Sequence, residues 1–192
     1  MARLFLAISL PVDIRERLAG IQKELAKTGA DVRWVRPEGI HLTLKFLGEV
    51  PENLIDKIAE AAQEAVRESG LKALHLGVKG LGSFPPHRAP RVIWTGLSGD
   101  LKELALLQRL LEEKLAHLGF EPEKRPFVPH LTLGRVKSTR KKEALLKEIS
   151  LRREEEIVPE RHFVVSEIVL YRSTLHPRGA IYTPVRRLPF GN

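Results

Sequence analysis

The tetrapeptide His-Leu-Thr-Leu occurs twice in the 192-residue chain, at residues 41–44 and 130–133. Successive side chains of a β-strand point to opposite faces, so an extended copy presents a histidine and a threonine on one face and two leucines on the other. The threonine hydroxyl then lies about 7 Å along the strand from the imidazole. Each copy is therefore expected to bury its leucines and to present an imidazole and a hydroxyl to a groove.

These four polar side chains suit the chemistry of a phosphate group. Near neutral pH, one of the two imidazoles of His41 and His130 can take a proton from water while the other gives a proton to a leaving oxygen. The hydroxyls of Thr43 and Thr132 can donate hydrogen bonds to the non-bridging phosphate oxygens. A single H-x-T triplet is a weak signal, but two copies with identical leucines favour a shared site over a purely structural repeat. The arrangement requires no metal and no cofactor.

Strands and helices alternate along the chain and must position these side chains. Alternating or continuous apolar runs predict strands, whereas wider apolar spacing with Pro at the start and Gly past the end predicts helices. Asp100 is suited to cap the helix that follows it. The predicted strands are 3–9, 32–35, 40–48, 72–82, 91–97, 126–136, 162–173 and 180–187, and the predicted helices are 11–27, 51–68, 100–118 and 137–149.

The order of elements is similar around the two tetrapeptides: a helix, a Pro-containing turn, the strand with the tetrapeptide, then another helix. No linker or low-complexity segment interrupts residues 1–192. The sequence therefore predicts one α+β domain made of two pseudo-symmetric lobes.

Composition and charge narrow the classes of function. The absence of cysteine excludes disulfides, thiol nucleophiles and thiolate-bound metals. The formal net charge of +8 fits either a polyanionic partner or a solvated basic surface. No stretch approaches the roughly 20 apolar residues needed to span a bilayer, so we expect a soluble, cytoplasmic protein without a membrane partner. No glycine-rich phosphate loop supports ATP-driven chemistry.

The paired tetrapeptides resemble the two H-x-T-x signatures of the 2H phosphoesterases. The whole chain is similar to their RNA 2',3'-cyclic phosphodiesterase branch, once described as 2'-5' RNA ligases. The similarity extends over RLFLAISLP, RWVRPEGIHLTLKFLGEV, LGSFPPHRAPRVIWTGL, PFVPHLTLGRV and LYRSTLHPRGAIYTPV. The resemblance implies two antiparallel sheets flanked by helices, with the signatures facing each other across a central cleft.

The resemblance also implies an activity and roles for particular residues. The activity is metal-independent hydrolysis of a terminal 2',3'-cyclic phosphate on RNA, such as a tRNA fragment, to a 2'-phosphomonoester. By motif position, His41 is the proton donor to the departing 3' oxygen and His130 is the proton acceptor from water. Thr43 and Thr132 bind the phosphate.

Two further residues follow from the same resemblance. Arg135 is expected to neutralise the phosphate or to cover the terminal base. Strict alternation places Arg135 on the face opposite His130, so this role needs a bend or a strand end at Gly134. Phe5 matches an aromatic position near the cleft and is expected either to contact the base or to be a buried core residue.

Other side chains are weaker candidates. The basic segments 137–142 and 186–187 are candidates to hold the RNA backbone, although such runs are usually solvated. Ser83 and Phe84 are candidates to frame the cleft. Trp34 and Trp94 are expected in the core.

Three functions remain open on the sequence. The first is the RNA-end hydrolase, for which we expect a monomer with no protein partner. The second is another enzymatic activity, either on cyclic phosphates of small nucleotides or in joining RNA ends by the reverse reaction. The third is a module that binds RNA ends without turnover.

Overall fold

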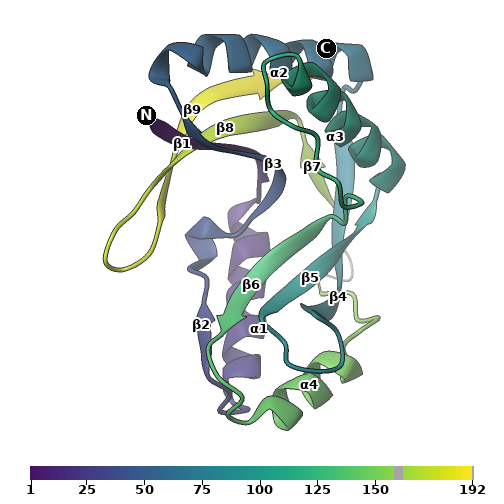
Figure 1. Cartoon of the computed structure of the whole chain (residues 1–192). Helices are drawn as coiled ribbons and strands as arrows, with labels where there is room; N and C mark the ends of the chain where they lie inside the picture. The colour runs from purple at the N-terminus through teal and green to yellow at the C-terminus, as the bar shows by residue number, and fades with distance from the viewer. Residues whose placement is uncertain (158–161, 192) are drawn as a thin grey trace.

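The computed structural model describes residues 1–157 and 162–191. The strands are β1 (Ala2–Ser9), β2 (Val32–Trp34), β3 (His41–Val50), β4 (Leu74–Phe84), β5 (Val92–Gly99), β6 (His130–Val136), β7 (Phe163–Val165), β8 (Glu167–Thr174) and β9 (Ile181–Pro189). They form sheet A, in the order β3-β1-β8-β9, and sheet B, in the order β2-β6-β5-β4-β7 (Figure 1). All their pairings are antiparallel, which confirms the predicted α+β class with two antiparallel sheets.

Four α-helices complete this part of the chain: α1 (Val12–Ala26), α2 (Ile55–Ser69), α3 (Leu101–Ala116) and α4 (Lys142–Leu151). α1 begins directly after Pro11, whose fixed φ and missing N–H suit the start of a helix. α2 ends at Gly70, which has a φ of 69° and accepts this left-handed conformation without strain. The short helices η1 (Pro37–Gly39) and η2 (Glu52–Leu54) lead into β3 and α2. None of these helices is both long and apolar enough to cross a membrane.

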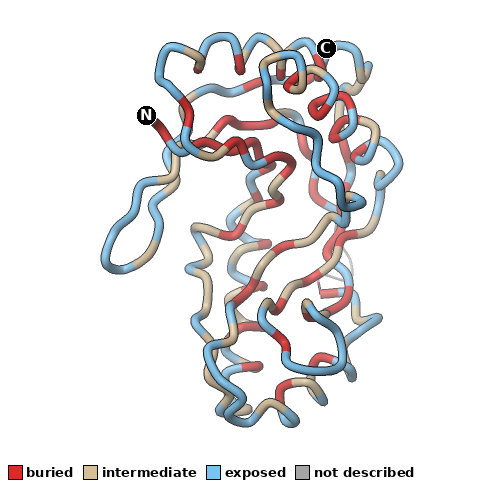
Figure 2. Tube along the Cα trace, in the orientation of Figure 1, coloured by how far each residue is buried: buried red, intermediate tan, exposed pale blue. Residues whose placement is uncertain are grey.

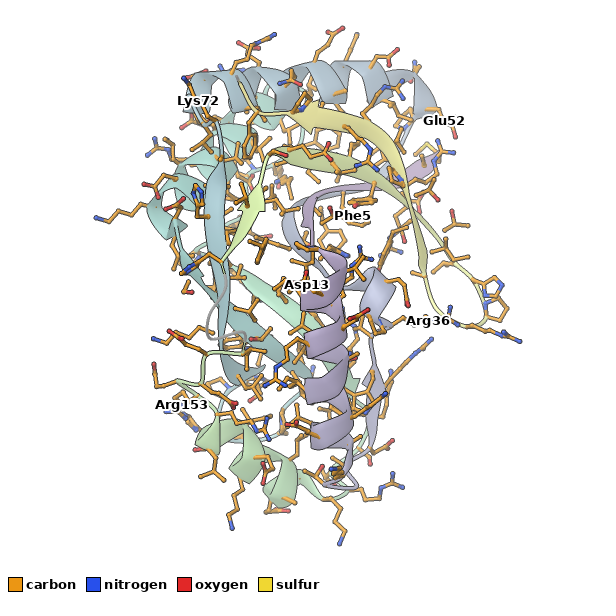
Figure 3. All side chains as sticks on the ribbon, turned by 180° about the vertical axis from the view of Figure 1, so that it is seen from behind. Phe5, Asp13, Arg36, Glu52, Lys72 and Arg153 are labelled. Carbon is orange, nitrogen blue, oxygen red and sulfur yellow. The ribbon has the colours of Figure 1, made fainter. Side chains whose placement is uncertain are left out.

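The two lobes, one built on sheet A and the other on sheet B, do not correspond to the first and second halves of the chain. Sheet A joins β1 and β3 to the C-terminal strands β8 and β9, while sheet B takes β2 from the first half of the chain. α1 follows β1 of sheet A but lies across sheet B, as the view from behind shows (Figure 3). α3 follows β5 of sheet B but packs beside α2, which covers sheet A (Figure 1).

The apolar core runs continuously through both lobes. Its members come from β1, both tetrapeptide strands and the inner faces of the helices, including Leu42, Leu131 and Ile21. The buried parts of the chain follow the middle of the molecule, and the β8–β9 loop is exposed (Figure 2). The leucines that the tetrapeptides were predicted to bury are buried.

Several boundaries and one helix cap differ from the prediction, and the predicted strand 162–173 is divided into β7 and β8. β6 begins at His130 rather than at residue 126, because Pro126 and Pro129 have no N–H to donate to a ladder. α4 begins at residue 142 rather than 137, after Lys141 in a left-handed conformation with a φ of 55°. Asp100 precedes α3 as predicted, but its carboxylate accepts a hydrogen bond from the backbone N–H of His75.

Candidate active site

Both tetrapeptides open a strand, and both contain a β-bulge at their fourth residue. In the β1–β3 ladder, Thr43 pairs with Ala7 and Lys45 with Leu6, which leaves Leu44 as the extra residue. A bulge of this kind shifts the alternation of side chains by one position. Lys45 therefore points to the buried side of sheet A rather than to the face of His41.

The second tetrapeptide repeats this geometry on β6. Thr132 pairs with Trp94 and Gly134 pairs with Ile93 of β5, so Leu133 is the extra residue. The two bulges occupy equivalent positions, although the strands belong to different sheets.

The bulge in β6 decides where Arg135 lies. Arg135 pairs with Val92, which shares a face of β5 with Trp94, the partner of Thr132. Residues that pair directly across a ladder point to the same face. Arg135 therefore lies on the same face as Thr132 and His130, as its expected role requires, and the cause is the bulge at Leu133 rather than an end of the strand at Gly134.

The bulge in β3 has the matching effect on Phe46. Phe46 pairs with Phe5, which shares a face of β1 with Ala7, the partner of Thr43. The ring of Phe46 is therefore on the face of His41, and the residue is 63% exposed. Five positions after its histidine, one strand presents an aromatic ring and the other presents the guanidinium of Arg135.

The two imidazoles are held in the same way. Nδ1 of His41 is 2.7 Å from the carbonyl oxygen of Gly39, and Nδ1 of His130 is 2.7 Å from that of Val128. Because a carbonyl oxygen only accepts, Nδ1 carries the proton and donates it in both residues. Nε2 of each neutral ring is left as a proton acceptor, or as a donor once the ring is protonated.

Aromatic rings surround His41. Phe5 stacks on the imidazole with ring centroids 4.8 Å apart, and Tyr182 meets it edge-on at 5.0 Å. Tyr171 lies 5.3 Å from Phe5 and 6.2 Å from His41, so it contacts both rings. Burial in this apolar surrounding lowers the pKa of His41 from 6.5 to about 4, against the opposing effect of its bond to Gly39. His41 is therefore neutral at pH 7 in the unliganded protein.

Phe5 is a wall of the site rather than an open platform. It is 1% exposed, and its ring contacts are with His41, Phe46 and the two tyrosines. The expectation that Phe5 is buried is confirmed, and its ring lies against His41. Its contact with an RNA base stays a prediction.

His130 has a different aromatic neighbourhood. Phe84 meets the imidazole edge-on, with ring centroids 5.3 Å apart, and Trp94 lies 6.4 Å away. Phe84 thus frames the site as expected, whereas Ser83 is buried on the other face of β4. The expectation that Trp94 belongs to the core is wrong, because its pairing with Thr132 places the indole on the histidine face.

Two cavities adjoin these residues. A cavity of about 190 Å³ lies beside His41, and its lining includes the polar residues Ser9, Arg15, Glu38, Tyr171 and Tyr182. A larger cavity, of about 430 Å³, is lined by Trp94, by Lys147 of α4 and by Arg153 just after α4. Of the two tetrapeptide histidines, His41 lines the smaller cavity and neither lines the larger one.

The strands that carry the two histidines approach each other in the middle of the molecule. Cα atoms of β3 and β6 come within 8 Å of one another (Figure 1). The structure thus brings His41, Thr43, His130, Thr132 and Arg135 onto two adjoining strands.

The predicted backbone-binding segments are only partly available. Arg186 pairs with Asp56 at 2.8 Å and Arg187 pairs with Glu167 at 2.9 Å, so both are committed to surface ion pairs. In the segment 137–142, Arg140 Nε donates to the carbonyl of Gly29, Lys142 is half-buried at the start of α4, and the other residues are exposed.

Sequence reasoning missed Tyr171, Tyr182 and Phe46 as neighbours of His41. The tyrosines lie in a segment, LYRSTLHPRGAIYTPV, that carries the family resemblance. Tyr171 is on β8, which pairs with β1 at the opposite end of the chain, and Tyr182 is on β9, the next strand of the sheet. Phe46 was missed because strict alternation places it on the leucine face.

Comparison with known proteins agrees with this geometry. The family described as LigT like Phosphoesterase matches residues 8–94 and 97–182. An RNA 2',3'-cyclic phosphodiesterase of Methanothermobacter thermautotrophicus is 38% identical over 181 residues, covering 94% of this chain and 95% of that protein. One from Thermotoga maritima is also 38% identical, covering 94% of this chain and 91% of the relative.

Solved structures show the same fold. The protein TT0787 of Thermus thermophilus superimposes with a TM-score of 0.77 at 27% identity, covering 98% of this chain and 97% of the other. Escherichia coli LigT complexed with 3'-AMP gives a TM-score of 0.74 at 26% identity, with 100% and 99% covered. The chain belongs to the LigT-like phosphoesterase family, which confirms the resemblance to the 2H phosphoesterases.

Proposed function

We propose that the chain hydrolyses the terminal 2',3'-cyclic phosphate of RNA to a 2'-phosphomonoester by acid–base catalysis with His41 and His130. The observation that carries this proposal is the identical anchoring of the two imidazoles, each with Nδ1 on a backbone carbonyl and Nε2 left for proton transfer. The names of the similar proteins support the substrate class.

The proposed reaction adds one water molecule across one phosphorus–oxygen bond. Nε2 of His130 takes a proton from the water as its oxygen attacks the phosphorus. The bond from phosphorus to the 3' oxygen breaks, and His41 gives a proton to that oxygen. The 2' oxygen keeps the phosphate, and the two imidazoles exchange protonation states until solvent restores them.

The lowered pKa of His41 bears on its role as proton donor. A ring with a pKa of about 4 is almost entirely neutral at pH 7. An anionic phosphate next to the ring stabilises the imidazolium and raises its pKa. We therefore propose that substrate binding itself protonates His41, so that the acid forms only when the cyclic phosphate is present.

The remaining polar side chains stabilise charge on the phosphate. Thr43 and Thr132 share a face with their histidines, which supports a role as donors to the non-bridging oxygens. In this proposal, the guanidinium of Arg135 neutralises the phosphate or covers the terminal base. No metal is needed in these steps.

The RNA chain upstream of the cyclic phosphate needs a path away from the histidines. We propose that it follows the cavity beyond Trp94, where an aromatic ring is combined with Lys147 and Arg153. Aromatic faces and cations together are the features that bind single-stranded RNA. The positive charge of the chain is consistent with such a partner. The monomeric state and the cytoplasmic location stay predictions.

The test is product analysis with an oligoribonucleotide that ends in a 2',3'-cyclic phosphate, incubated in EDTA. Wild type is expected to give a 2'-phosphomonoester, and His41→Ala and His130→Ala are each expected to lose about 100-fold or more in rate. His117→Ala changes an exposed histidine at the end of α3 and should retain full activity. Phosphorus NMR distinguishes the 2' from the 3' product.

The same assay separates the other candidate functions. Turnover of cyclic mononucleotides but not of the oligonucleotide would move the proposal to small nucleotides. Joining of added RNA ends at the same two histidines would show the reverse reaction. Binding without conversion by wild type would refute hydrolysis in favour of an RNA-end binding module.

A further inference from the structure

Two buried glutamines bind the bulged residues of the two tetrapeptides. Nε2 of Gln22, on α1, donates to the carbonyl oxygen of Leu133 at 2.9 Å. Nε2 of Gln108, on α3, donates to the carbonyl oxygen of Leu44 at 3.3 Å. The exposed fractions of the two glutamines are 6% and 8%. In each tetrapeptide, therefore, the carboxamide of a glutamine contacts the carbonyl oxygen of the bulged leucine.

The two contacts cross between the lobes. α1 follows the first strand of sheet A, but Gln22 binds a bulge in sheet B. α3 follows β5 of sheet B, but Gln108 binds a bulge in sheet A. Each glutamine uses its second N–H locally: Gln22 donates to the carbonyl of Val35 at 2.7 Å, and Gln108 to the carboxylate of Glu112 at 3.0 Å.

A bulge leaves a residue outside the regular ladder, so its polar groups need other partners. Leu44 and Leu133 are 3% and 0% exposed, which keeps water from their carbonyl oxygens. The carbonyl oxygen of Leu133 also accepts a hydrogen bond from the backbone N–H of Val35 at 2.9 Å, so Gln22 supplies a second donor to the same oxygen. These buried hydrogen bonds from the two carboxamides favour the bulged register over a regular one. The regular register would turn Phe46 and Arg135 to the buried face.

We propose that Gln22 and Gln108 are positioning residues, each of which fixes the bulge in the opposite tetrapeptide. Gln22 thereby holds Arg135, and Gln108 holds Phe46, on the face that binds the substrate. Neither glutamine touches the reacting atoms. The inference rests on the proposed function for its kinetic test, and on the bulge geometry alone for its structural test.

The kinetic test uses Gln22→Met, which keeps the length of the side chain and removes both donors. We expect KM for the cyclic-phosphate oligonucleotide to rise about tenfold, with kcat changed less than about threefold, because the change acts through Arg135 rather than on proton transfer. Arg135→Ala should raise KM in the same way. Adding Gln22→Met to Arg135→Ala should then have almost no further effect, since both remove one interaction. Additive losses would overturn the proposal.

The same kinetic test can be made independently on Gln108 and the first tetrapeptide. Gln108→Met and Phe46→Ala are expected to weaken RNA binding and to be non-additive in the same manner. Gln108→Met should remain additive with Arg135→Ala, because it acts on the other strand. The crossed arrangement would be contradicted if Gln108→Met were additive with Phe46→Ala and non-additive with Arg135→Ala.

A matched variant separates positioning from general stability. Leu18→Ala removes a fully buried side chain from α1, the helix of Gln22, and is expected to destabilise the fold by creating a cavity. It leaves the bond to Leu133 in place, so KM should stay unchanged. An equal rise of KM in Leu18→Ala would overturn the positioning role.

Amide hydrogen exchange gives a readout that needs no activity. The amides of residues 133–135 should exchange faster in Gln22→Met than in Leu18→Ala at equal global stability. If wild type failed to hydrolyse the oligonucleotide while this local acceleration was found, the positioning of the bulge would stand and the proposed function would fail. Equal exchange in the two variants would overturn the positioning role.

Discussion

His41 and Phe5 form a stacked pair, with 26° between the ring planes, in which a titratable ring lies on a fully buried apolar one. Such contact removes water from the imidazole, and water is what stabilises its charged form. The pair therefore links a packing contact directly to the protonation of the proposed acid.

The first prediction concerns the titration of His41 by NMR. In the free protein its ring should titrate near a pKa of about 4, and bound inorganic phosphate should raise that value. Phe5→Leu should also raise it toward 6.5, because a smaller side chain admits water. A value near 6.5 in the free wild type would contradict the role of burial.

The second prediction concerns stability against pH. The folded-state pKa of His41 lies below its unfolded value, so between pH 6.5 and pH 4 the unfolded chain binds more protons and folding stability falls as pH falls. The loss between about pH 6.5 and about pH 4.5 should be about 2 kcal/mol for this group. Urea unfolding of His41→Phe at the two pH values should show a loss smaller by that amount. The same loss in both proteins would contradict the assignment.

The third prediction concerns the hydroxyls of Thr43 and Thr132. Replacing either threonine with valine keeps the shape and removes the donor to the phosphate. Each variant should lose about 100-fold in kcat, the scale found when one preorganised donor is removed. Thr139→Val, in the turn before α4, is the matched control and should be unaffected. Unchanged kcat in both site variants would remove the threonines from the mechanism.

The fourth prediction concerns the buried ion pair next to the first tetrapeptide. Nζ of Lys45 donates to the carboxylate of Glu112 at 2.7 Å and to the carbonyl of Glu121 at 2.6 Å. Lys45→Met leaves the carboxylate buried without its cation and should cost about 3–5 kcal/mol of unfolding free energy. Lys45→Met/Glu112→Leu should recover most of that loss. Urea denaturation measures both, and a double variant as unstable as the single one would count against the explanation.

The fifth prediction concerns the path of the RNA. Lys147→Glu/Arg153→Glu should raise KM about tenfold for an oligonucleotide and weaken its salt dependence, while leaving a cyclic mononucleotide unaffected. Lys57→Glu/Arg67→Glu makes the same change of charge on α2 and is the control. Equal effects on long and short substrates, or equal effects of the two double variants, would exclude the cavity beyond Trp94 as the path.

The sequence predicts much of this architecture because its signals are local. Pro11 and Gly70 mark the start and end of helices through their own backbone preferences, and the paired tetrapeptides mark two equivalent strands. The side-chain alternation that identified His41 and Thr43 holds over those few residues. It fails at the fifth position, where a bulge shifts the side chains that follow, such as Phe46 and Arg135.

The rest depends on contacts between distant segments. The bulges at Leu44 and Leu133 are held by Gln108 and Gln22, which lie in other parts of the chain. Trp94 is typical of a core residue until its pairing with Thr132 is known. The order of neighbouring residues in the sequence does not predict such pairings between distant strands.

The crossed packing of α1 and α3 also limits how this chain can be divided. A cut between α2 and β4 would leave the first fragment with only two strands of sheet A, and with a helix whose natural partner lies in the other fragment. A piece carrying one tetrapeptide could cover its apolar face only by exchanging that helix with a second piece, as subunits do in domain-swapped dimers. The whole chain is thus arranged like a swapped dimer whose two subunits have been joined into one polypeptide.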